Sequence, residues 1–158
     1  RHRIGLKYHR DRWGASAEYE IFDDSIEPFV AFHLNGDLDV LRKPGNTLGM
    51  TAAFSRFFFE GGFDDRNVSL LDLGMHHRYT LSRDLTWWMS TAYRFETDSV
   101  DGHTSGVDVE AGVEYQIGDL TVDLSAEYDL LNIEEDRQDG FGIWLRVRRE
   151  FGNLLARR

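Results

Sequence analysis

Cysteine is absent from the 158 residues, which excludes disulfide frameworks, thiolate metal sites and cysteine nucleophiles. Proline occurs only at Pro28 and Pro44, and we expect both at a turn or at the start of a strand, where no ladder hydrogen bond is lost. No uncharged apolar run reaches the roughly 18 residues that a membrane-spanning helix needs. The sequence does not open on a basic segment followed by an apolar one, so it shows no signal peptide.

A basic footprint is also missing, because the formal net charge is −10 at pH 7. Nucleic-acid binding needs such a footprint and is therefore excluded. The sequence does contain glycine at 15 positions, and aromatic residues make up 13% of the chain. Together with the scarcity of proline, this composition is typical of a β-rich protein.

Apolar and polar residues alternate along almost the whole chain, whereas the 3.6-residue period of a helix is nearly absent. The clearest example is VDVEAGVEYQIGDLTVDLSAEY, residues 107–128, which alternates, turns at Gly118-Asp119 and alternates again. The alternation predicts nine strands, at Arg3–His9, Trp13–Phe22, Phe29–Leu41, Thr47–Phe59, Ser69–Leu81, Leu85–Glu96, Gly106–Ile117, Leu120–Leu131 and Gly140–Phe151.

The predicted strands are long for a globular protein, where strands average roughly 5–6 residues, and suit a bilayer, which a tilted strand crosses in about 9–11 residues. Their connections alternate between short ones (9–12, 42–46, 82–84, 118–119) and longer ones (23–28, 60–68, 97–105, 132–139). Short turns on one side and longer loops on the other are typical of outer-membrane barrels. In hydrocarbon every backbone group must pair, so strands cross only as a closed barrel. We therefore predict an all-β fold, a transmembrane antiparallel up-and-down β-barrel.

The aromatic residues of the expected outward face fall into two bands, with mainly Ala, Val, Leu and Met between them. Amphipathic rings sit well at the headgroup level, so we interpret the bands as membrane girdles. The alternative is that aromatic residues simply favour strands. The girdle residues are Tyr8, Trp13, Tyr79, Trp87 and Tyr115 near the short turns, and Tyr19, Tyr93 and Tyr128 near the longer loops.

The last expected strand, GFGIWLRVRREF, resembles the C-terminal recognition strand of Gram-negative outer-membrane β-barrel proteins. The residues that carry the resemblance are Gly142, Leu145, Val147 and Phe151. The resemblance implies that Phe151 is an assembly determinant, read by the barrel assembly machinery. The sequence departs from the family pattern in one respect, because GNLLARR follows Phe151 where the family usually stops at the aromatic residue.

Nine is an awkward strand count, because the first and last strands of an antiparallel barrel must run in opposite directions and bacterial single-chain barrels have even counts. Two explanations stay open. The chain is the C-terminal part of a larger barrel, with an odd number of further strands upstream. Alternatively, Arg3–His9 is no strand, and the chain forms a self-contained eight-stranded barrel.

The expected inward face carries many charges, and acidic positions outnumber basic ones. In a wide lumen these groups are hydrated and favour cations, whereas in a narrow barrel they must pair with one another. The imbalance favours the hydrated lumen. Inward glycines leave room for larger neighbours such as Trp88 and Trp144, or mark bends. The pore-lining residues that we predict are Glu110, Glu114, Asp123, Glu127, Asp72, Arg78, Arg94 and Arg146.

The two rims differ in charge. The longer loops are acidic, which predicts a solvated rim; divalent-cation binding is the alternative, at Asp64 with Asp65 or at 134–136. The short-turn rim is more basic, which suits lipid headgroups, an acidic periplasmic partner or plain solvation. The expected partners are therefore outer-membrane lipid and lipopolysaccharide, the assembly machinery, and further strands or a periplasmic protein.

His103 and Ser105 form a His-x-Ser pair that resembles, in part, the pair of outer-membrane lipid A deacylases. Gly106 stands where that family has Asn, no acid lies at the family's spacing, and the pair falls in an expected loop. His76 and His77 point to opposite faces of one strand and do not share a metal easily. We therefore expect no enzyme, no catalytic residue, no metal and no cofactor.

The prediction that combines these features is a Gram-negative outer-membrane barrel that acts as a pore, export channel or sheath with an acidic, cation-favouring lumen. One alternative is a small closed structural or deacylase-like barrel. Another is a soluble β-sandwich binding module, whose apolar face packs on a second sheet.

Overall fold

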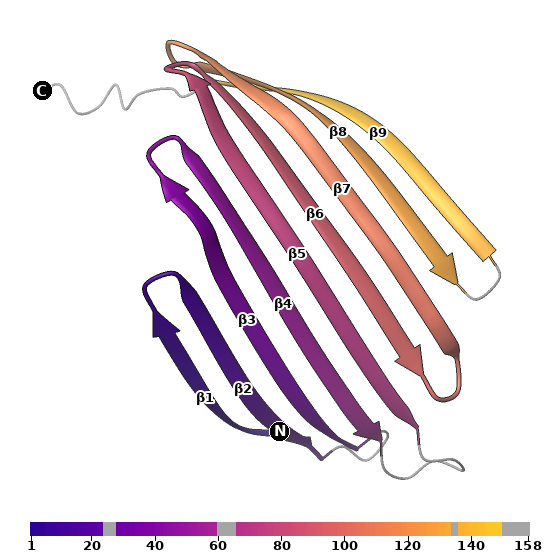
Figure 1. Ribbon diagram of the computed structural model, residues 1–158. Coiled ribbons are helices and arrows are strands. Elements are labelled where there is room, and N and C mark those ends of the chain that lie inside the picture. Colours follow the sequence, from indigo (N-terminus) through magenta and orange to yellow (C-terminus); the bar gives the residue numbers. More distant parts are fainter. Residues whose placement is uncertain (24–27, 60–65, 134–135, 150–158) are drawn as a thin grey trace, which may run out of the picture.

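A computed structural model describes residues 1–23, 28–59, 66–133 and 136–149 (Figure 1). These residues form nine long strands that follow one another along the chain. The strands are β1 (His2–Arg10), β2 (Trp13–Phe22), β3 (Phe29–Lys43), β4 (Asn46–Phe59), β5 (Asn67–Ser82), β6 (Leu85–Asp98), β7 (Gly102–Ile117), β8 (Leu120–Ile133) and β9 (Asp136–Arg149).

The strands form one antiparallel sheet in the order β1 to β9, so each strand lies beside its neighbours in the sequence. This up-and-down arrangement confirms the predicted all-β fold class. The sheet is a single twisted layer (Figure 1), and the described residues supply no second layer to cover either face. The β-sandwich alternative is therefore wrong for this part of the chain. Among these residues, no helix has the length and apolar character needed to cross a membrane.

Tight turns close the hairpins at one end of the sheet. Arg10 pairs with Trp13, Lys43 with Asn46, and Ile117 with Leu120, so each turn contains two residues. Gly45 (φ 71°) and Gly118 (φ 59°) adopt the left-handed conformation that such turns require and that glycine takes without strain. Pro44 precedes Gly45 in its turn, as the sequence predicts.

Two of the expected longer loops are wrong. The strands β6 and β7 continue to Asp98 and from Gly102, so a three-residue turn, 99–101, replaces the predicted loop 97–105. Similarly, Ile133 pairs with Asp136, so β8 and β9 extend through most of the predicted loop 132–139. The ends of these strands carry mainly polar residues on both faces. Apolar and polar residues therefore no longer alternate there, although the backbone hydrogen bonds between the strands continue.

The FFF segment breaks the alternation because it places phenyl rings on both faces. Phe58 shares a face with Met50 and Phe54, whereas Phe57 and Phe59 lie on the opposite face. There the ring of Phe29 contacts both, with centroids 5.6 and 5.7 Å apart. The otherwise polar face thus carries a phenyl cluster at the end of the sheet opposite the tight turns.

The two edges of the sheet, β1 and β9, do not pair with each other among the described residues. Residues 2–10 pair with β2 along the whole length of β1, so the alternative in which the first segment is no strand is wrong. The eight-stranded closed barrel that depended on it is wrong as well. With nine antiparallel strands, β1 and β9 run in the same direction, and direct pairing between them would be parallel.

Candidate functional site

The strand register assigns the side chains to two faces of the sheet. All eight residues predicted to line a pore share one face, which we call the polar face: Asp72, Arg78, Arg94, Glu110, Glu114, Asp123, Glu127 and Arg146. The opposite face, which we call the apolar face, carries the rows of Ala, Val, Leu and Met. That the polar face lines a pore stays a prediction.

Some charges of the polar face pair with one another across the strands. The Nε of Arg94 lies 2.7 Å from Oδ1 of Asp72 on the neighbouring strand. The carboxylate of Glu114 lies between two arginines, 3.1 Å from Arg78 and 3.7 Å from Arg148. These pairs are half exposed, so water screens them and each adds little to stability.

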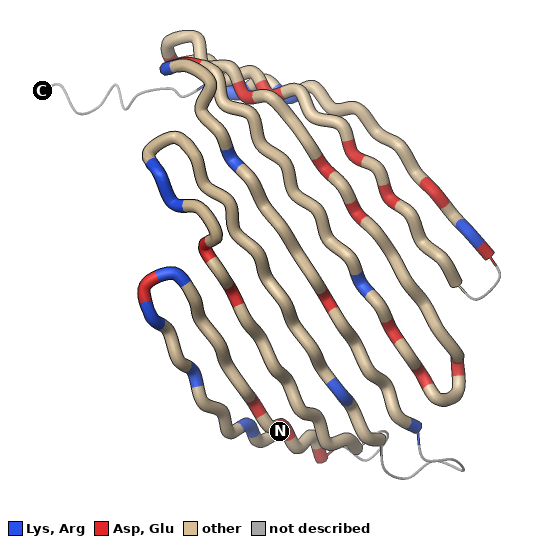
Figure 2. Tube along the Cα trace, viewed as in Figure 1, with Lys and Arg blue, Asp and Glu red and all other residues tan. Residues whose placement is uncertain are grey.

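Carboxylates concentrate on β7 and β8, which Figure 2 shows as red positions on adjacent strands. Asp108 lies directly opposite Asp129, and Glu110 lies directly opposite Glu127. Among the described residues, no lysine or arginine forms an ion pair with any of these four, which we call the acidic array. Like charges directly opposite each other destabilise a sheet, so folding alone does not explain the acidic array.

Two tryptophans cover glycines of the polar face and hold carboxylates. The indole Nε1 of Trp88 donates a hydrogen bond of 3.2 Å to Asp123, and its ring lies over Gly112. Likewise, Nε1 of Trp144 donates to Glu127 at 3.2 Å, beside Gly142. The expectation that glycines leave room for these rings is confirmed. Asp123 is consequently 8% exposed although it lies on the polar face.

The carboxylate of Glu20, on β2, is buried and interacts with residues of the strands on both sides. The sequence alone does not single it out. Glu20 is 1% exposed and pairs with Arg1 at 2.5 Å and with Arg3 at 2.8 Å. His33 Nε2 lies 3.4 Å from the same carboxylate, and its Nδ1 hydrogen-bonds Ser55 Oγ at 2.8 Å. Alternation places Glu20 and His33 on one face, but it does not predict that Arg1 and Arg3 pair with the Glu20 carboxylate.

Two groups of side chains bring metal-binding atoms within 4.8 Å of one another: Glu18, Glu20 and His33, and Asp108, Glu127 and Asp129. In the first group Arg1 and Arg3 already compensate the carboxylates. The second group belongs to the acidic array and is largely open to solvent. The expected absence of a metal and a cofactor stays a prediction.

The eight predicted girdle residues all lie on the apolar face. Near the tight turns the rings of Tyr8 and Trp13 lie 5.0 Å apart, and Tyr79 pairs directly with Trp87. Tyr115 completes this band, and Tyr19, Tyr93 and Tyr128 form the band toward the other end. Six of the eight are more than a third exposed, so within the described chain this face has no cover. Their contact with lipid stays a prediction.

The residues of the predicted assembly signal divide between the faces of β9. Leu145 (69% exposed) and Val147 (58% exposed) lie on the apolar face, and Gly142 lies on the polar face. Phe151 lies outside the described residues, as do Asp64, Asp65, Glu134 and Glu135 of the expected cation-binding loops. The assembly role therefore stays a prediction.

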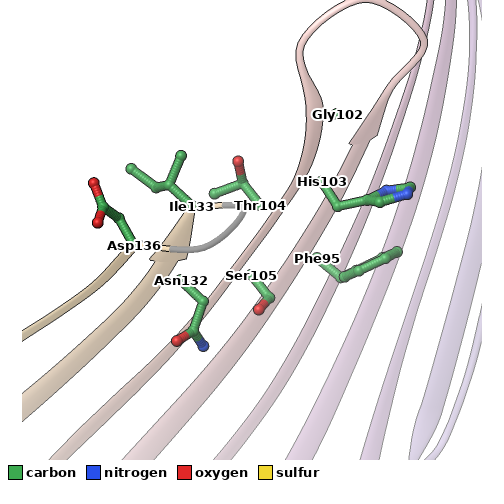
Figure 3. Close-up of a pocket in the computed structure, with 8 residues that line it drawn as sticks. All are labelled: Phe95, Gly102, His103, Thr104, Ser105, Asn132, Ile133 and Asp136. Carbon is green, nitrogen blue, oxygen red and sulfur yellow. The ribbon is translucent and has the colours of Figure 1, made fainter.

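An open depression near the β8–β9 connection contains the His-x-Ser pair (Figure 3). His103 and Ser105 lie in strand β7 rather than in the expected loop, both on the apolar face. The His103 ring stacks on Phe95, and its Nδ1 lies 3.3 Å from Thr97 Oγ1. Among the described side chains no hydrogen bond joins His103 to Ser105, and the nearest acids along the strand, Asp108 and Glu110, lie on the opposite face. The pair is thus not arranged as a nucleophile and its base.

An ion cluster fixes the three-residue turn between β6 and β7. Arg66 donates hydrogen bonds to Asp98, the shorter of them 2.5 Å, and lies 2.8 Å from Asp101. The Asp98 side chain is 4% exposed, and it lies beyond the aromatic band at the end of the strand. Hydrogen bonding from Arg66 lowers the pKa of Asp98 below its ordinary value.

We expect Asp98→Asn to lower the free energy of unfolding by about 1–2 kcal/mol at pH 7, because the charge-assisted bonds to Arg66 are lost. A carboxyl group with a lowered pKa contributes stability above its unfolded pKa of roughly 3.9, and this contribution is lost as the pH falls through the folded value. Urea unfolding in lipid vesicles at pH 7 and about pH 3 measures the difference, which should shrink at the lower pH. Asp101→Asn, at a position 69% exposed, is the matched control and should cost less. Equal costs for the two variants would contradict the assignment.

The sequence matches no protein-family model and no curated protein. Among solved structures, the fold is similar to a loop L8 deletion mutant of OmpT, an outer membrane protein of Vibrio cholerae, with a TM-score of 0.51 and 13% identity. The likeness covers 89% of this chain and 60% of that protein. OmpT folded in vitro gives a TM-score of 0.49 at 12% identity, with coverage of 89% and 62%. The nine strands thus share the fold of part of the loop L8 deletion mutant, and the chain spans about 60% of that protein's length.

Proposed function

We propose that this sheet is part of the wall of an outer-membrane β-barrel that acts as a pore, with the polar face lining an acidic lumen that favours cations. The observation that carries the proposal is the acidic array. Four carboxylates in two directly opposed pairs oppose folding, and hydration by an aqueous lumen reduces their mutual repulsion. Carboxylates that line a pore raise the local concentration of cations.

The apolar face supports a location in the outer membrane. Its middle rows are mainly aliphatic, and Ile4, Leu6, Leu124 and Ile143 are all more than half exposed, which is costly in water. The similar solved structures are outer membrane proteins. Strands of 14–16 residues, as in β3 to β9, are long enough to cross a bilayer in tilted orientation and to extend beyond it.

The open edges support a barrel completed by further strands. An edge strand in hydrocarbon leaves backbone groups unpaired, which a membrane does not permit. A second copy in the same membrane orientation would place β9 beside a parallel β1. An odd number of additional strands instead gives antiparallel pairs at both edges and an even total. The expectation of further strands in the barrel is thus part of this proposal.

Single-channel recording of the complete protein in a planar bilayer with a salt gradient tests the pore. We expect the wild type to conduct with a preference for cations. Replacing Asp108 and Asp129 with Asn, and Glu110 and Glu127 with Gln, should lower the cation-to-anion permeability ratio by about two- to fivefold, because the array no longer attracts cations.

The matched control neutralises carboxylates in the tight turns, Asp84→Asn with Asp119→Asn, and should change selectivity less. A correctly inserted protein that does not conduct would overturn the pore and favour a plugged or structural barrel. Conduction with the same selectivity in all variants would remove the acidic array from the mechanism. A folded protein that stays in plain buffer without detergent would contradict the membrane location itself.

A further inference from the structure

Arg56 is a cation on the apolar face. Its partners in the register are Phe32 on β3 and Ser69 on β5, both on that face, and its own strand places Phe54 and Phe58 beside it. The side chain is exposed. A cation that faces hydrocarbon at the bilayer midplane costs about 2–4 kcal/mol, and the cost falls to about 0–1 kcal/mol near the interface.

The position of Arg56 along β4 places it at the interface rather than at the midplane. It lies two residues beyond Phe54, toward the end of the sheet that carries Tyr19, Tyr93 and Tyr128. The apolar face turns polar at this level on the next strands, with Ser69, Thr97 and His103. Arg56 therefore lies where lipid headgroups begin, if the aromatic bands mark the edges of the hydrocarbon.

The ring of Phe58 orients the guanidinium away from the hydrocarbon. The Cζ of Arg56 lies 4.9 Å from the centroid of this ring, which is a cation–π distance. Phe58 follows Arg56 toward the end of the strand, so the charge is directed outward along the barrel. Among the described residues no carboxylate forms an ion pair with Arg56, although arginine favours bidentate anion binding.

We propose that Arg56, supported by Phe58, binds a phosphate group of a lipid. The lipid lies in the leaflet at the end of the sheet opposite the tight turns. The inference rests on the proposed membrane location and goes beyond the proposed pore, since it concerns the opposite face of the sheet. The phosphates of lipid headgroups are the anions that surround a barrel at this level. The planar guanidinium matches phosphate oxygens in a two-point, charge-assisted interaction.

The test measures binding of diphosphoryl lipid A to the complete protein, folded in detergent micelles, by native mass spectrometry. We expect Arg56→Gln to weaken binding about tenfold, the loss of one charge-assisted pair. Arg56→Lys keeps the charge but not the two-point geometry, so it should weaken binding only about two- to threefold. Lys7→Gln removes a cation from the polar face and should leave binding unchanged.

Two further probes identify the group that is bound. Dephosphorylated lipid A should bind equally to the wild type and to Arg56→Gln, and inorganic phosphate alone should not compete at the same concentration. Unchanged binding of diphosphoryl lipid A by Arg56→Gln overturns the inference, and so does full competition by free phosphate. If channel recording shows no conductance while Arg56→Gln loses the lipid, the pore fails and the lipid site stands. If the protein never enters micelles in folded form, both fail.

Discussion

Met89→Arg is expected to destabilise the folded protein in lipid vesicles by about 2–4 kcal/mol, which is the cost of an arginine near the midplane of a lipid-facing barrel surface. Met89 lies on the apolar face, in register with His77 and Ala111, between the two aromatic bands of β6. No carboxylate of the described residues lies on that face at this level to compensate the charge. Urea titration in vesicles, followed by tryptophan fluorescence and by heat-modifiable gel migration, measures the loss.

Ser90→Arg is the matched control, because it makes the same change one residue further on, on the opposite face. Ser90 pairs with Glu110 and His76 on the polar face, so the new cation gains a carboxylate neighbour and water. We expect this variant to retain wild-type stability or to gain some. If both arginine variants lost stability equally, or if Met89→Arg cost nothing, the apolar face would not face lipid.

Within an uninterrupted strand, alternation predicts which face each side chain occupies, because a strand has a side-chain period of two. It assigns the eight predicted pore residues to one face and the eight girdle residues to the other, as the register shows. Parity breaks at two register shifts, where Val40 between Asp39 and Leu41, and Leu81 between Thr80 and Ser82, are extra residues. A bulge of this kind has no simple sequence signature, so alternation alone does not reveal it.

Contacts across several strands were beyond prediction from the sequence. The bond from Trp88 to Asp123 joins β6 to β8, and it depends on the missing side chain at Gly112 between them. The ion pairs of Glu20 similarly involve Arg3 on the edge strand β1 and Arg1, which directly precedes this strand. Odd or even position along a strand gives the face that a residue occupies. Its neighbours on adjacent strands depend on the register, which each hairpin turn sets for one pair of strands.

The charged residues of the polar face fall into two groups, those paired with an opposite charge and those of the acidic array. Two ion pairs compensate their own charges: Arg94 with Asp72, and Glu114 with Arg78. A sheet tolerates such pairs whether water or protein covers the polar face. The acidic array has no such compensation among the described residues and is the part of the polar face that needs water or a cation. Selection for stability alone would not place Asp108 opposite Asp129.

Gly112→Val is the second substitution with a large expected effect. A Cβ at this position would lie 2.7 Å from Cζ2 of Trp88 and 3.0 Å from the backbone oxygen of Leu124. The indole must move, the bond from its Nε1 to Asp123 is lost, and the buried carboxylate loses its donor. Overpacking of this kind costs about 1–3 kcal/mol, and the lost hydrogen bond adds to it. The free energy of unfolding in lipid vesicles measures the cost.

Gly140→Val supplies the control on the same face, since its nearest neighbour would be Asp129 Oδ2 at 3.9 Å, an ordinary contact. Removal of the ring should relieve part of the strain, so Gly112→Val should cost less in a Trp88→Leu background. The double-mutant cycle should give a coupling of about 1 kcal/mol or more. Additive costs would show that Trp88 does not occupy the space over Gly112, because only a steric conflict between the two positions makes the substitutions interdependent.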